Sequence, residues 1–284
     1  MPVQLIADSG ATKCEWYLSG NGKNKTFSTI GISPYFLGGQ QIIELLQHDL
    51  VPQLEAAEIS EVHFYGTGLG NPNNVNIICK ALQQLFPDSK VKANTDLLGA
   101  ARALCGHEKG MACILGTGSN SCYYNGKKIM KNTPSLGYIL GDEGSGAYLG
   151  KKVVQYYLYN TFDEDLKARF DAQFVTTQVE ILESIYKNPL PNRYLAGFTT
   201  FLSQNRGHYM VENILEDSLS DFFINHLYKY TESWTMPINF IGSVAFSFKD
   251  VIQELCNVNE LDLGTVLKNP MEGLVKFHSA DLSI

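Results

Sequence analysis

Two short stretches of this chain resemble each other, and they constrain its fold more than any other feature. Residues 6–22 read IADSGATKCEWYLSGNG, and residues 114–126 read ILGTGSNSCYYNG. Such self-similarity predicts two duplicated domains, each of which begins with a β-hairpin. At an offset of 108 residues, the matched pairs are Gly10 and Gly118, Thr12 and Asn120, Cys14 and Cys122, and Trp16 and Tyr124.

The residues around the repeats alternate between strand and helix patterns, which is typical of an α/β fold. We expect a first domain over residues 1–107 and a second over 108–269 that carries a helical insertion, with a C-terminal helix over about 270–284 packing back on the first domain. The expected strands span residues 3–8, 13–18, 25–30, 62–66, 90–94, 111–116, 121–126 and 236–243. The expected helices span 40–57 (interrupted by Pro52), 73–86, 96–104, much of 163–233, 249–255 and 270–280.

Composition excludes several classes of function. The formal net charge is −7, with 22 basic and 29 acidic residues, which is not the charge of a nucleic-acid-binding protein. We find neither a signal peptide nor an apolar run of roughly 18–20 residues, so we expect a cytoplasmic protein that does not bind membranes. The six cysteines have scattered spacings without a CxxC motif, which indicates buried thiols and no zinc site.

The turns of the two expected hairpins are built from small polar residues. They read DSGATK at 8–13 and GTGSN at 116–120. Runs of backbone N–H groups with little side-chain bulk form anion-binding nests, so two such turns could hold a polyphosphate. The alternative is that both are ordinary hairpin turns.

Other nucleotide-binding motifs do not fit the chain. No GxxxxGK[ST] motif occurs, which excludes a P-loop. The stretch YGTGLGN at 65–71 has the spacing GxGxG and not GxGxxG, and no acidic residue follows at the distance that a dinucleotide fold requires.

A third glycine-rich stretch, GDEGSG at 141–146, precedes an apolar, tyrosine-rich run that is expected to be helical. Asp142 could cap that helix and Glu143 could lie in its first turn. Capping does not require glycines, and each helical glycine costs roughly 1 kcal/mol relative to alanine. Gly144 and Gly146 therefore indicate that another part of the backbone, or a ligand, approaches this segment closely.

These motifs, in this order, resemble the N-acetylglucosamine kinase branch of the actin-like superfamily of sugar kinases and chaperone ATPases. The chain is also similar to the activator ATPases of benzoyl-CoA and hydroxyacyl-CoA reductases, which leaves a reductase activator as an alternative function. The resemblance covers nearly the whole chain and depends on DSGATK (8–13), YGTGLG (65–70), TDLLGAAR (95–102), LGTGSN (115–120), GDEGSG (141–146) and FIGSVA (240–245).

The resemblance implies two ribonuclease H-like domains of the actin-like ATPase kind, with ATP and Mg²⁺ in the cleft between them. Asp96 falls on the family's catalytic base, although it could also cap the helix that follows. Asp8 is the candidate ligand of Mg²⁺. The residues implied to bind the nucleotide are Asp8, Gly10, Thr12 and Lys13 in the first loop, Gly116, Thr117 and Gly118 in the second, and Gly242, Ser243 and Val244.

For the sugar, the resemblance points to N-acetylglucosamine phosphorylated at its 6-hydroxyl by a homodimeric enzyme. In the eukaryotic kinases an asparagine follows the third strand, whereas Ser33 and Pro34 stand there in this chain. That difference leaves N-acetylmuramic acid open as the acceptor. The implied sugar-binding residues are Ser33, Asp96, Ser119, Asn120, Asp142 and Glu143.

Overall fold

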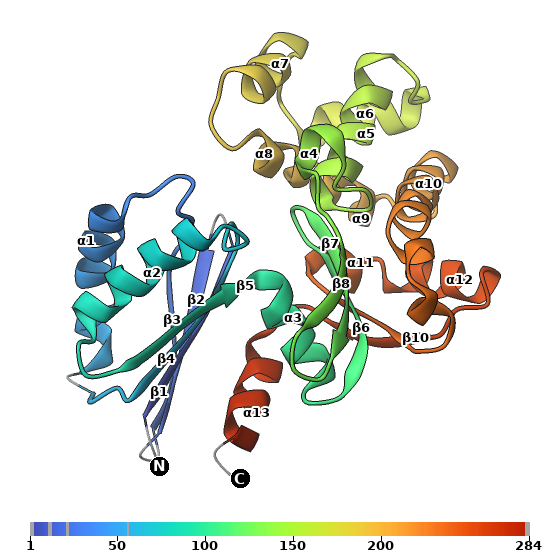
Figure 1. The fold of residues 1–284 in the computed structure, drawn as a ribbon. Helices are drawn as coiled ribbons and strands as arrows, with labels where there is room; N and C mark the ends of the chain where they lie inside the picture. Colours follow the sequence, from blue (N-terminus) through green and yellow to red (C-terminus); the bar gives the residue numbers. More distant parts are fainter. Residues whose placement is uncertain (1–2, 11–12, 21–22, 56, 282–284) are drawn as a thin grey trace. The chain divides into compact units, whose positions relative to one another are not determined.

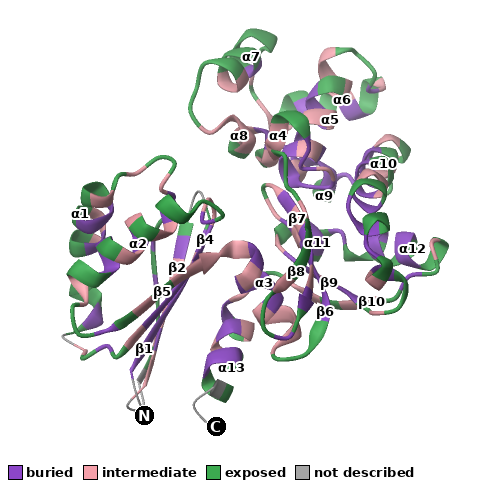
Figure 2. Cartoon of the chain, viewed as in Figure 1, coloured by how far each residue is buried: buried purple, intermediate pink, exposed green. Residues whose placement is uncertain are grey.

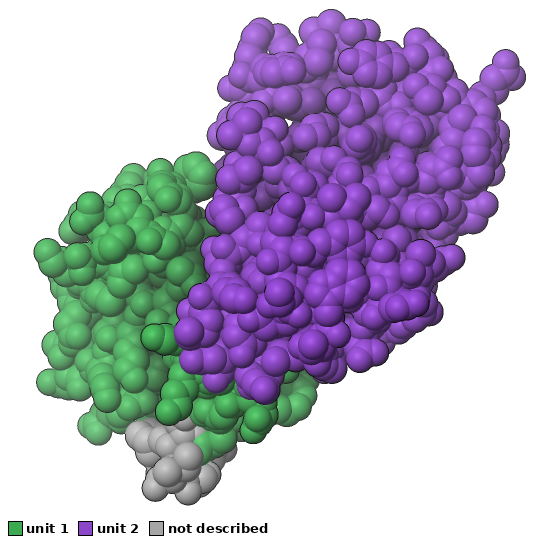
Figure 3. Space-filling view, turned by 45° about the vertical axis from the view of Figure 1, so that its right-hand side comes forward, with its two compact units in different colours: residues 1–108, 126–128, 270–284 green, residues 109–125, 129–269 purple. Residues whose placement is uncertain are grey.

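The structure is a computed structural model that describes residues 3–10, 13–20, 23–55 and 57–281. The chain forms two compact units, which are distinguished by colour in Figure 3. Unit 1 comprises residues 1–108, 126–128 and 270–284, and unit 2 comprises residues 109–125 and 129–269. Among the described residues, no helix combines the length and the apolar character needed to cross a membrane.

The centre of unit 1 is a five-stranded sheet in the order β3-β2-β1-β4-β5. The first three strands are antiparallel, and β4 and β5 run parallel to β1. The strands are β1 (Gln4–Ser9), β2 (Lys13–Gly20), β3 (Lys23–Ile30), β4 (Glu61–Gly66) and β5 (Lys90–Thr95).

Side chains alternate between the two faces of this sheet, and helices cover both faces (Figure 1). Leu5 and Phe64 pack into the core that α1 and α2 cover, whereas Ile6 and Tyr65 pack against Leu274 of α13. Figure 2 shows the buried central strands. The helices of unit 1 are α1 (Gly39–Asp49), the 3₁₀ helix η1 (Val51–Leu54), α2 (Pro72–Leu85), α3 (Asp96–Cys105) and α13 (Met271–Asp281).

Unit 2 repeats the same sheet. Its order, read from the edge hairpin, is β8-β7-β6-β9-β10, again with three antiparallel strands followed by two parallel ones. The strands are β6 (Lys109–Leu115), β7 (Ser119–Asn125), β8 (Ile129–Thr133), β9 (Ile238–Ile241) and β10 (Leu263–Leu267).

Helices make up most of the rest of unit 2, as the sequence predicts for residues 163–233. Aromatic side chains from α6, α9 and α10 fill much of its core, among them Phe170, Phe201 and Phe222. The helices are α4 (Gly137–Leu140), α5 (Gly146–Leu158), α6 (Glu164–Gln173), α7 (Gln178–Tyr186), α8 (Pro191–Gly197), α9 (Thr199–Gln204), α10 (Tyr209–Asn225), α11 (Ser243–Ser247) and α12 (Lys249–Val258), with 3₁₀ helices η2 (Leu227–Lys229) and η3 (Thr231–Trp234).

One local prediction is wrong, and two short elements were not predicted. The helix expected over 40–57 ends at Asp49, because the proline at position 52 restricts the residue before it and starts a 3₁₀ turn. Strand β10 and the single turn α4 were not expected. Gly264 weakens the strand signal of β10, whose register with β9 is also irregular.

The repeat is real in architecture but shifted in register. Ser9 pairs with Cys14 next to the first turn, whereas Cys122 pairs with Ala112, far from the second turn. The pair next to the second turn is Leu115 and Ser119. The two cysteines that match at an offset of 108 residues therefore lie at different distances from the turns of their hairpins.

Candidate functional site

In unit 1, the carboxyl ends of three parallel strands lie side by side and bring Asp8 and Asp96 to the same end of the sheet. The register pairs Ser9 with Gly66 and Gly66 with Thr95, so β1, β4 and β5 end side by side. Asp8 is the penultimate residue of β1, and Asp96 directly follows β5. Ligands of open parallel sheets bind at the carboxyl ends of the strands.

The negative charge of Asp96 acts on the Asp8 carboxyl. The pKa of Asp8 is raised to about 7, first by burial and then by the negative charges of Asp96 and Glu15. Burial also raises the pKa of Asp96, against the stabilising hydrogen bond that the Leu97 N–H donates to its Oδ1 at 2.8 Å. Two partly buried carboxyls of like charge favour a cation or a proton between them.

Asp96 is not the cap of its helix. The N-cap of α3 is Thr95, whose Oγ1 accepts a hydrogen bond from the Leu98 N–H at 3.2 Å. The capping alternative for Asp96 is therefore wrong. Among the described residues, the Asp96 carboxylate accepts from the Leu97 N–H and from its own N–H and from no side chain, so it has acceptor capacity left for a ligand.

The first hairpin turn is described in part. The N–H of Gly10, an exposed residue, donates to the Lys13 carbonyl at 3.0 Å, while Thr12 lies outside the described residues. The Lys13 ammonium lies 3.3 Å from Glu15 Oε2. Glu15 is a residue that sequence reasoning missed; its pairing opposite Asp8 on β2 could have been deduced from the hairpin register.

Ser33 lies in unit 1 beside the YGTGLG turn. Its side chain is buried, and within the described part of the chain its Oγ has no hydrogen-bond partner. A Cβ at Gly68 would lie 3.6 Å from Ser33 Oγ and 2.8 Å from the Tyr35 ring, so the missing side chain at Gly68 makes room for this segment. A buried hydroxyl without a partner costs about 1–3 kcal/mol, which a polar ligand could offset.

In unit 2, the turn between β6 and β7 is joined to the start of α5. The Gly146 N–H donates to the Gly116 carbonyl at 2.8 Å, and the Ala147 N–H donates to the Thr117 carbonyl at 3.0 Å. The first N–H groups of a helix have no partner within the helix, so the turn satisfies them. The GTGSN and GDEGSG motifs are therefore parts of one structure.

Asp142 is the residue that connects these two motifs. It is buried, and its backbone has a left-handed φ of 57°. Its Oδ1 accepts hydrogen bonds from Ser135 Oγ at 2.8 Å and from the Ser119 N–H at 3.4 Å. Burial raises the pKa of Asp142, and these two donors oppose the shift. A Cβ at Gly118 would lie 3.0 Å from Asp142 Oδ2, so a side chain there would displace this carboxylate by a few tenths of an ångström.

The cap of α5 is Ser145, which accepts a hydrogen bond from the Tyr148 N–H at 3.2 Å. The prediction that Asp142 could be this cap is therefore wrong. The glycines of the segment meet protein atoms: a Cβ at Gly144 would lie 2.9 Å from Phe222 Cβ, and one at Gly146 would lie 3.1 Å from Ala196 Cβ. Close packing within unit 2 explains them.

Ser119 and Asn120 follow the turn on β7. Ser119 is buried, and its Oγ has no hydrogen-bond partner among the described residues. The Asn120 Oδ1 accepts from the Ser121 N–H and from Asn132 Nδ2, both at 2.9 Å. Ser119 thus resembles Ser33 in having a buried hydroxyl with unused hydrogen-bonding capacity.

The FIGSVA motif lies against the same turn of unit 2. Gly242 has φ 126°, and a Cβ there would lie 2.2 Å from the Leu115 carbonyl oxygen, so no other residue fits. Ser243 is exposed, whereas the Val244 side chain belongs to the hydrophobic core. Of these three predicted nucleotide residues, Gly242 and Ser243 are therefore the ones at the surface of the turn.

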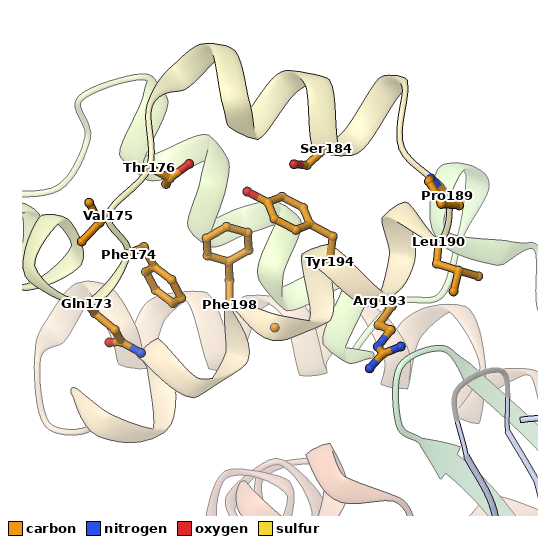
Figure 4. A pocket seen from close by; sticks show the side chains of 11 residues that line it. Gln173, Phe174, Val175, Thr176, Ser184, Pro189, Leu190, Arg193, Tyr194 and Phe198 are labelled. Atoms are coloured by element: carbon orange, nitrogen blue, oxygen red, sulfur yellow. The ribbon is translucent and has the colours of Figure 1, made fainter. Parts of the chain in front are cut away.

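A pocket lies on the helical part of unit 2, but none of the predicted site residues lines it. That pocket, of about 690 Å³, lies around α7 and α8, where Figure 4 shows Phe174, Tyr194 and Phe198 in its wall. No group of three or more His, Cys, Asp or Glu side chains among the described residues could hold a metal ion.

Comparison with known proteins gives strong matches among solved structures. No protein-family model and no curated protein matches the chain. A protein from Porphyromonas gingivalis, provisionally described as an N-acetylglucosamine kinase, is 39% identical over 99% of this chain and 100% of that chain, with a TM-score of 0.94.

Two further structures are more distant. A protein from Chromobacterium violaceum with the same provisional description is 18% identical over 98% of this chain and 99% of that chain, with a TM-score of 0.73. A ROK family glucokinase from Streptomyces griseus, solved with glucose and AMPPNP, is 15% identical over 99% and 98% of the two chains, with a TM-score of 0.57. These two show the fold alone, and the predicted α/β fold class is confirmed.

Proposed function

Because this chain belongs to the family of the Porphyromonas gingivalis protein and has the actin-like ATPase fold, we propose that it is an ATP-dependent kinase of N-acetylated amino sugars. The first candidate acceptor is the 6-hydroxyl of N-acetylglucosamine. The observation that carries the proposal is the 39% identity over 99% of the chain.

The unpaired hydroxyls support a polar substrate. Ser33 in unit 1 and Ser119 in unit 2 are both buried, and neither Oγ has a partner in the described part of the chain. Sugar hydroxyls and an acetamido group offer both donors and acceptors, so they suit such groups. Within unit 2, Asp142 and Asn120 would add a carboxylate and an amide beside Ser119.

Asp96 is proposed as the base. Phosphoryl transfer has a loose transition state, so positioning matters more than base strength, and a carboxylate suffices. Asp96 would accept the hydrogen of the acceptor hydroxyl, orient its oxygen, and take the proton late in the reaction. The raised pKa of Asp96 suits a group that must hold that proton.

The residues present fit a magnesium nucleotide. Mg²⁺ prefers one or two carboxylates and takes its other oxygens from phosphates and water. Asp8 supplies one such carboxylate, and among the described residues no donor bonds it, so it is free to bind a cation directly or through water. A Cβ at Gly116 would meet nothing within 4 Å, which leaves open space at the turn for phosphate oxygens. Bound there, ATP and Mg²⁺ supply the phosphoryl group and neutralise its charge.

The acceptor is tested by measuring kcat/KM for N-acetylglucosamine, N-acetylmuramic acid and glucose at saturating Mg-ATP. A site that pairs with an acetamido group should prefer such a sugar over glucose by roughly 10²-fold or more. Equal use of glucose would overturn the acceptor. Preference for N-acetylmuramic acid would fit the Ser33 side chain, which is shorter than the asparagine of the eukaryotic kinases and leaves more room for a larger sugar. ATP hydrolysis that no sugar stimulates would instead favour the reductase-activator alternative, and ³¹P NMR of the product tests the 6-position.

A further inference from the structure

The segment that carries Asp142 and Glu143 is supported by the C-terminal end of α10. Phe222 fills the space beside Gly144, and Asp221 Oδ2 accepts a hydrogen bond from Tyr148 Oη at 2.7 Å. Helix α10 therefore packs against both the GDEGSG segment and the first turns of α5 (Figure 1).

His226 directly follows α10 and is the residue of this support that faces Glu143. Its ring is buried and stacks on Phe222, with centroids 4.7 Å apart and an interplanar angle of 19°. Its Nε2 lies 3.6 Å from Glu143 Oε2, and its Nδ1 lies 3.1 Å from Ser121 Oγ. Both nitrogens of the imidazole therefore have polar neighbours on different elements.

The Glu143 carboxylate favours one tautomer of His226. Tyr230 Oη accepts from the Thr133 N–H at 2.6 Å and donates to the Ser121 carbonyl at 2.9 Å. Ser121 Oγ lies 2.9 Å from Tyr230 Oη and 3.1 Å from Nδ1, so it can donate its proton to either. The Glu143 carboxylate 3.6 Å from Nε2 decides between them, because it favours a proton on Nε2, with Ser121 Oγ as the donor to Nδ1. The opposite tautomer would place a bare nitrogen lone pair against the Glu143 carboxylate.

The charges around the ring agree with a neutral imidazole. Burial lowers the pKa of His226, and the nearby Glu143 and Asp142 carboxylates oppose that shift. The Ser121 hydroxyl and the Phe222 ring also face the imidazole, and Tyr230 Oη lies 2.9 Å from that Ser121 hydroxyl. At neutral pH the ring thus presents one N–H to Glu143.

We propose that His226 is a positioning residue that orients the Glu143 carboxylate toward the sugar through its Nε2–H, while Ser121 Oγ contacts Nδ1 on the other side of the ring. This inference rests on the proposed function, because it assigns His226 to the support of a sugar-binding carboxylate. His226 itself does not touch the reacting atoms.

The test uses two amides that each replace one nitrogen of the ring. In His226→Gln the amide can reach the position of Nε2 and still donate to Glu143, whereas in His226→Asn it reaches only the position of Nδ1. We expect His226→Asn to raise KM for the sugar about tenfold or more with little change in KM for ATP, and His226→Gln to recover most of the loss. His48→Asn, at a histidine whose side chain is 90% exposed in unit 1, is the control.

A double-mutant cycle separates positioning from general destabilisation. If His226 acts through Glu143, then adding His226→Asn to Glu143→Gln should cost almost nothing further in sugar affinity. Additive losses, equal losses in sugar and ATP affinity, or failure of His226→Gln to recover more than His226→Asn would overturn the proposal.

A measurement without turnover separates this proposal from the proposed function. The ¹⁵N spectrum of the histidine rings in the wild-type protein should show a neutral His226 with its proton on Nε2, and Glu143→Gln should change that signal. A proton on Nδ1 would overturn the positioning role. Absence of sugar-dependent ADP formation in the wild type would instead overturn the kinase assignment, whatever the tautomer.

Discussion

At the scale of single residues, the two units contribute carboxylates whose surroundings differ. Asp142 already accepts hydrogen bonds from Ser135 and Ser119, so it is fixed in place before any ligand arrives. Within the described part of the chain, Asp96 accepts only from backbone N–H groups, those of Leu97 and of Asp96 itself. A carboxylate held by several donors is suited to recognition, whereas one with unused acceptors is suited to take a proton.

This difference leads to a prediction for Asp96→Asn. Loss of a general base costs about 10²–10⁴-fold, so sugar-dependent ADP release should fall by that factor while ATP affinity changes little. Asp88→Asn makes the same chemical change at an exposed position of unit 1 and should leave both unchanged. Turnover of Asp96→Asn within threefold of wild type would remove Asp96 from the mechanism.

Two glycines of one turn should respond differently to the same methyl group. Gly116→Ala places its Cβ in open space, so folding should be unaffected, whereas ATP affinity should fall roughly tenfold if phosphates bind there. Gly118→Ala brings its Cβ to 3.0 Å from Asp142 Oδ2 and should raise KM for the sugar. Calorimetric titration with AMPPNP and thermal unfolding measure the two effects, and unaltered nucleotide affinity in Gly116→Ala would contradict the phosphate site.

At the scale of elements, α13 is attached to unit 1 through an unusual set of buried polar groups. The His278 ring stacks on His63 with centroids 3.9 Å apart, and its Nε2 lies 2.9 Å from Tyr65 Oη. Arg102 of α3 donates to the same Tyr65 oxygen at 2.7 Å. Because Tyr65 Oη accepts from Arg102, it is well placed to donate its own proton to a neutral His278.

This arrangement predicts a loss of stability in acid. The pKa of His278 is lowered from 6.5 to about 3, first by burial and then by the charges of His63 and Arg102. Between those two values the unfolded chain binds a proton that the folded chain does not. The stabilisation is therefore complete above pH 6.5 and is lost as the pH falls toward 3, by about 1.4 kcal/mol per pH unit.

The variant His278→Gln tests this assignment, because its amide oxygen can still accept from Tyr65 but cannot titrate. We expect urea unfolding at pH 8 and pH 5 to show a free-energy difference that is about 2 kcal/mol smaller in the variant than in the wild type. An identical pH dependence in both proteins would mean that another group, such as His63, is responsible.

At the scale of the whole molecule, the alternation of strands and helices could be read from the sequence because each element has its own periodicity. The duplication could be inferred from the similar turn sequences. The register of strand pairing in each hairpin could not, since it depends on the number of residues in the turn. The partners of Glu143 and the unused hydroxyls of Ser33 and Ser119 were also hidden. They depend on contacts between residues far apart in sequence, which no local pattern encodes.

The C-terminal segment belongs to unit 1, where α13 packs on α3. This packing depends on Gly273, where a Cβ would lie 2.3 Å from the Ala103 carbonyl oxygen. We predict that Gly273→Ala forces the two helices apart and destabilises the protein by about 1–3 kcal/mol, the usual cost of overpacking. Sugar-dependent ADP formation should fall at temperatures where the wild type is still active, since Asp96 is the first residue of α3.

The control for this prediction lies on the same helix. Glu272→Gln removes only the exposed pair with Lys276, one turn away, and should leave the stability nearly unchanged because solvent screens this pair. Thermal unfolding of the two variants beside the wild type measures the difference. If Gly273→Ala melts within one degree of Glu272→Gln, the close contact of α13 with α3 is not what holds the chain's end to unit 1. The effect at Gly273 must exceed the effect at Glu272 because backbone atoms of α3 cannot yield to a new methyl group as an exposed side chain can.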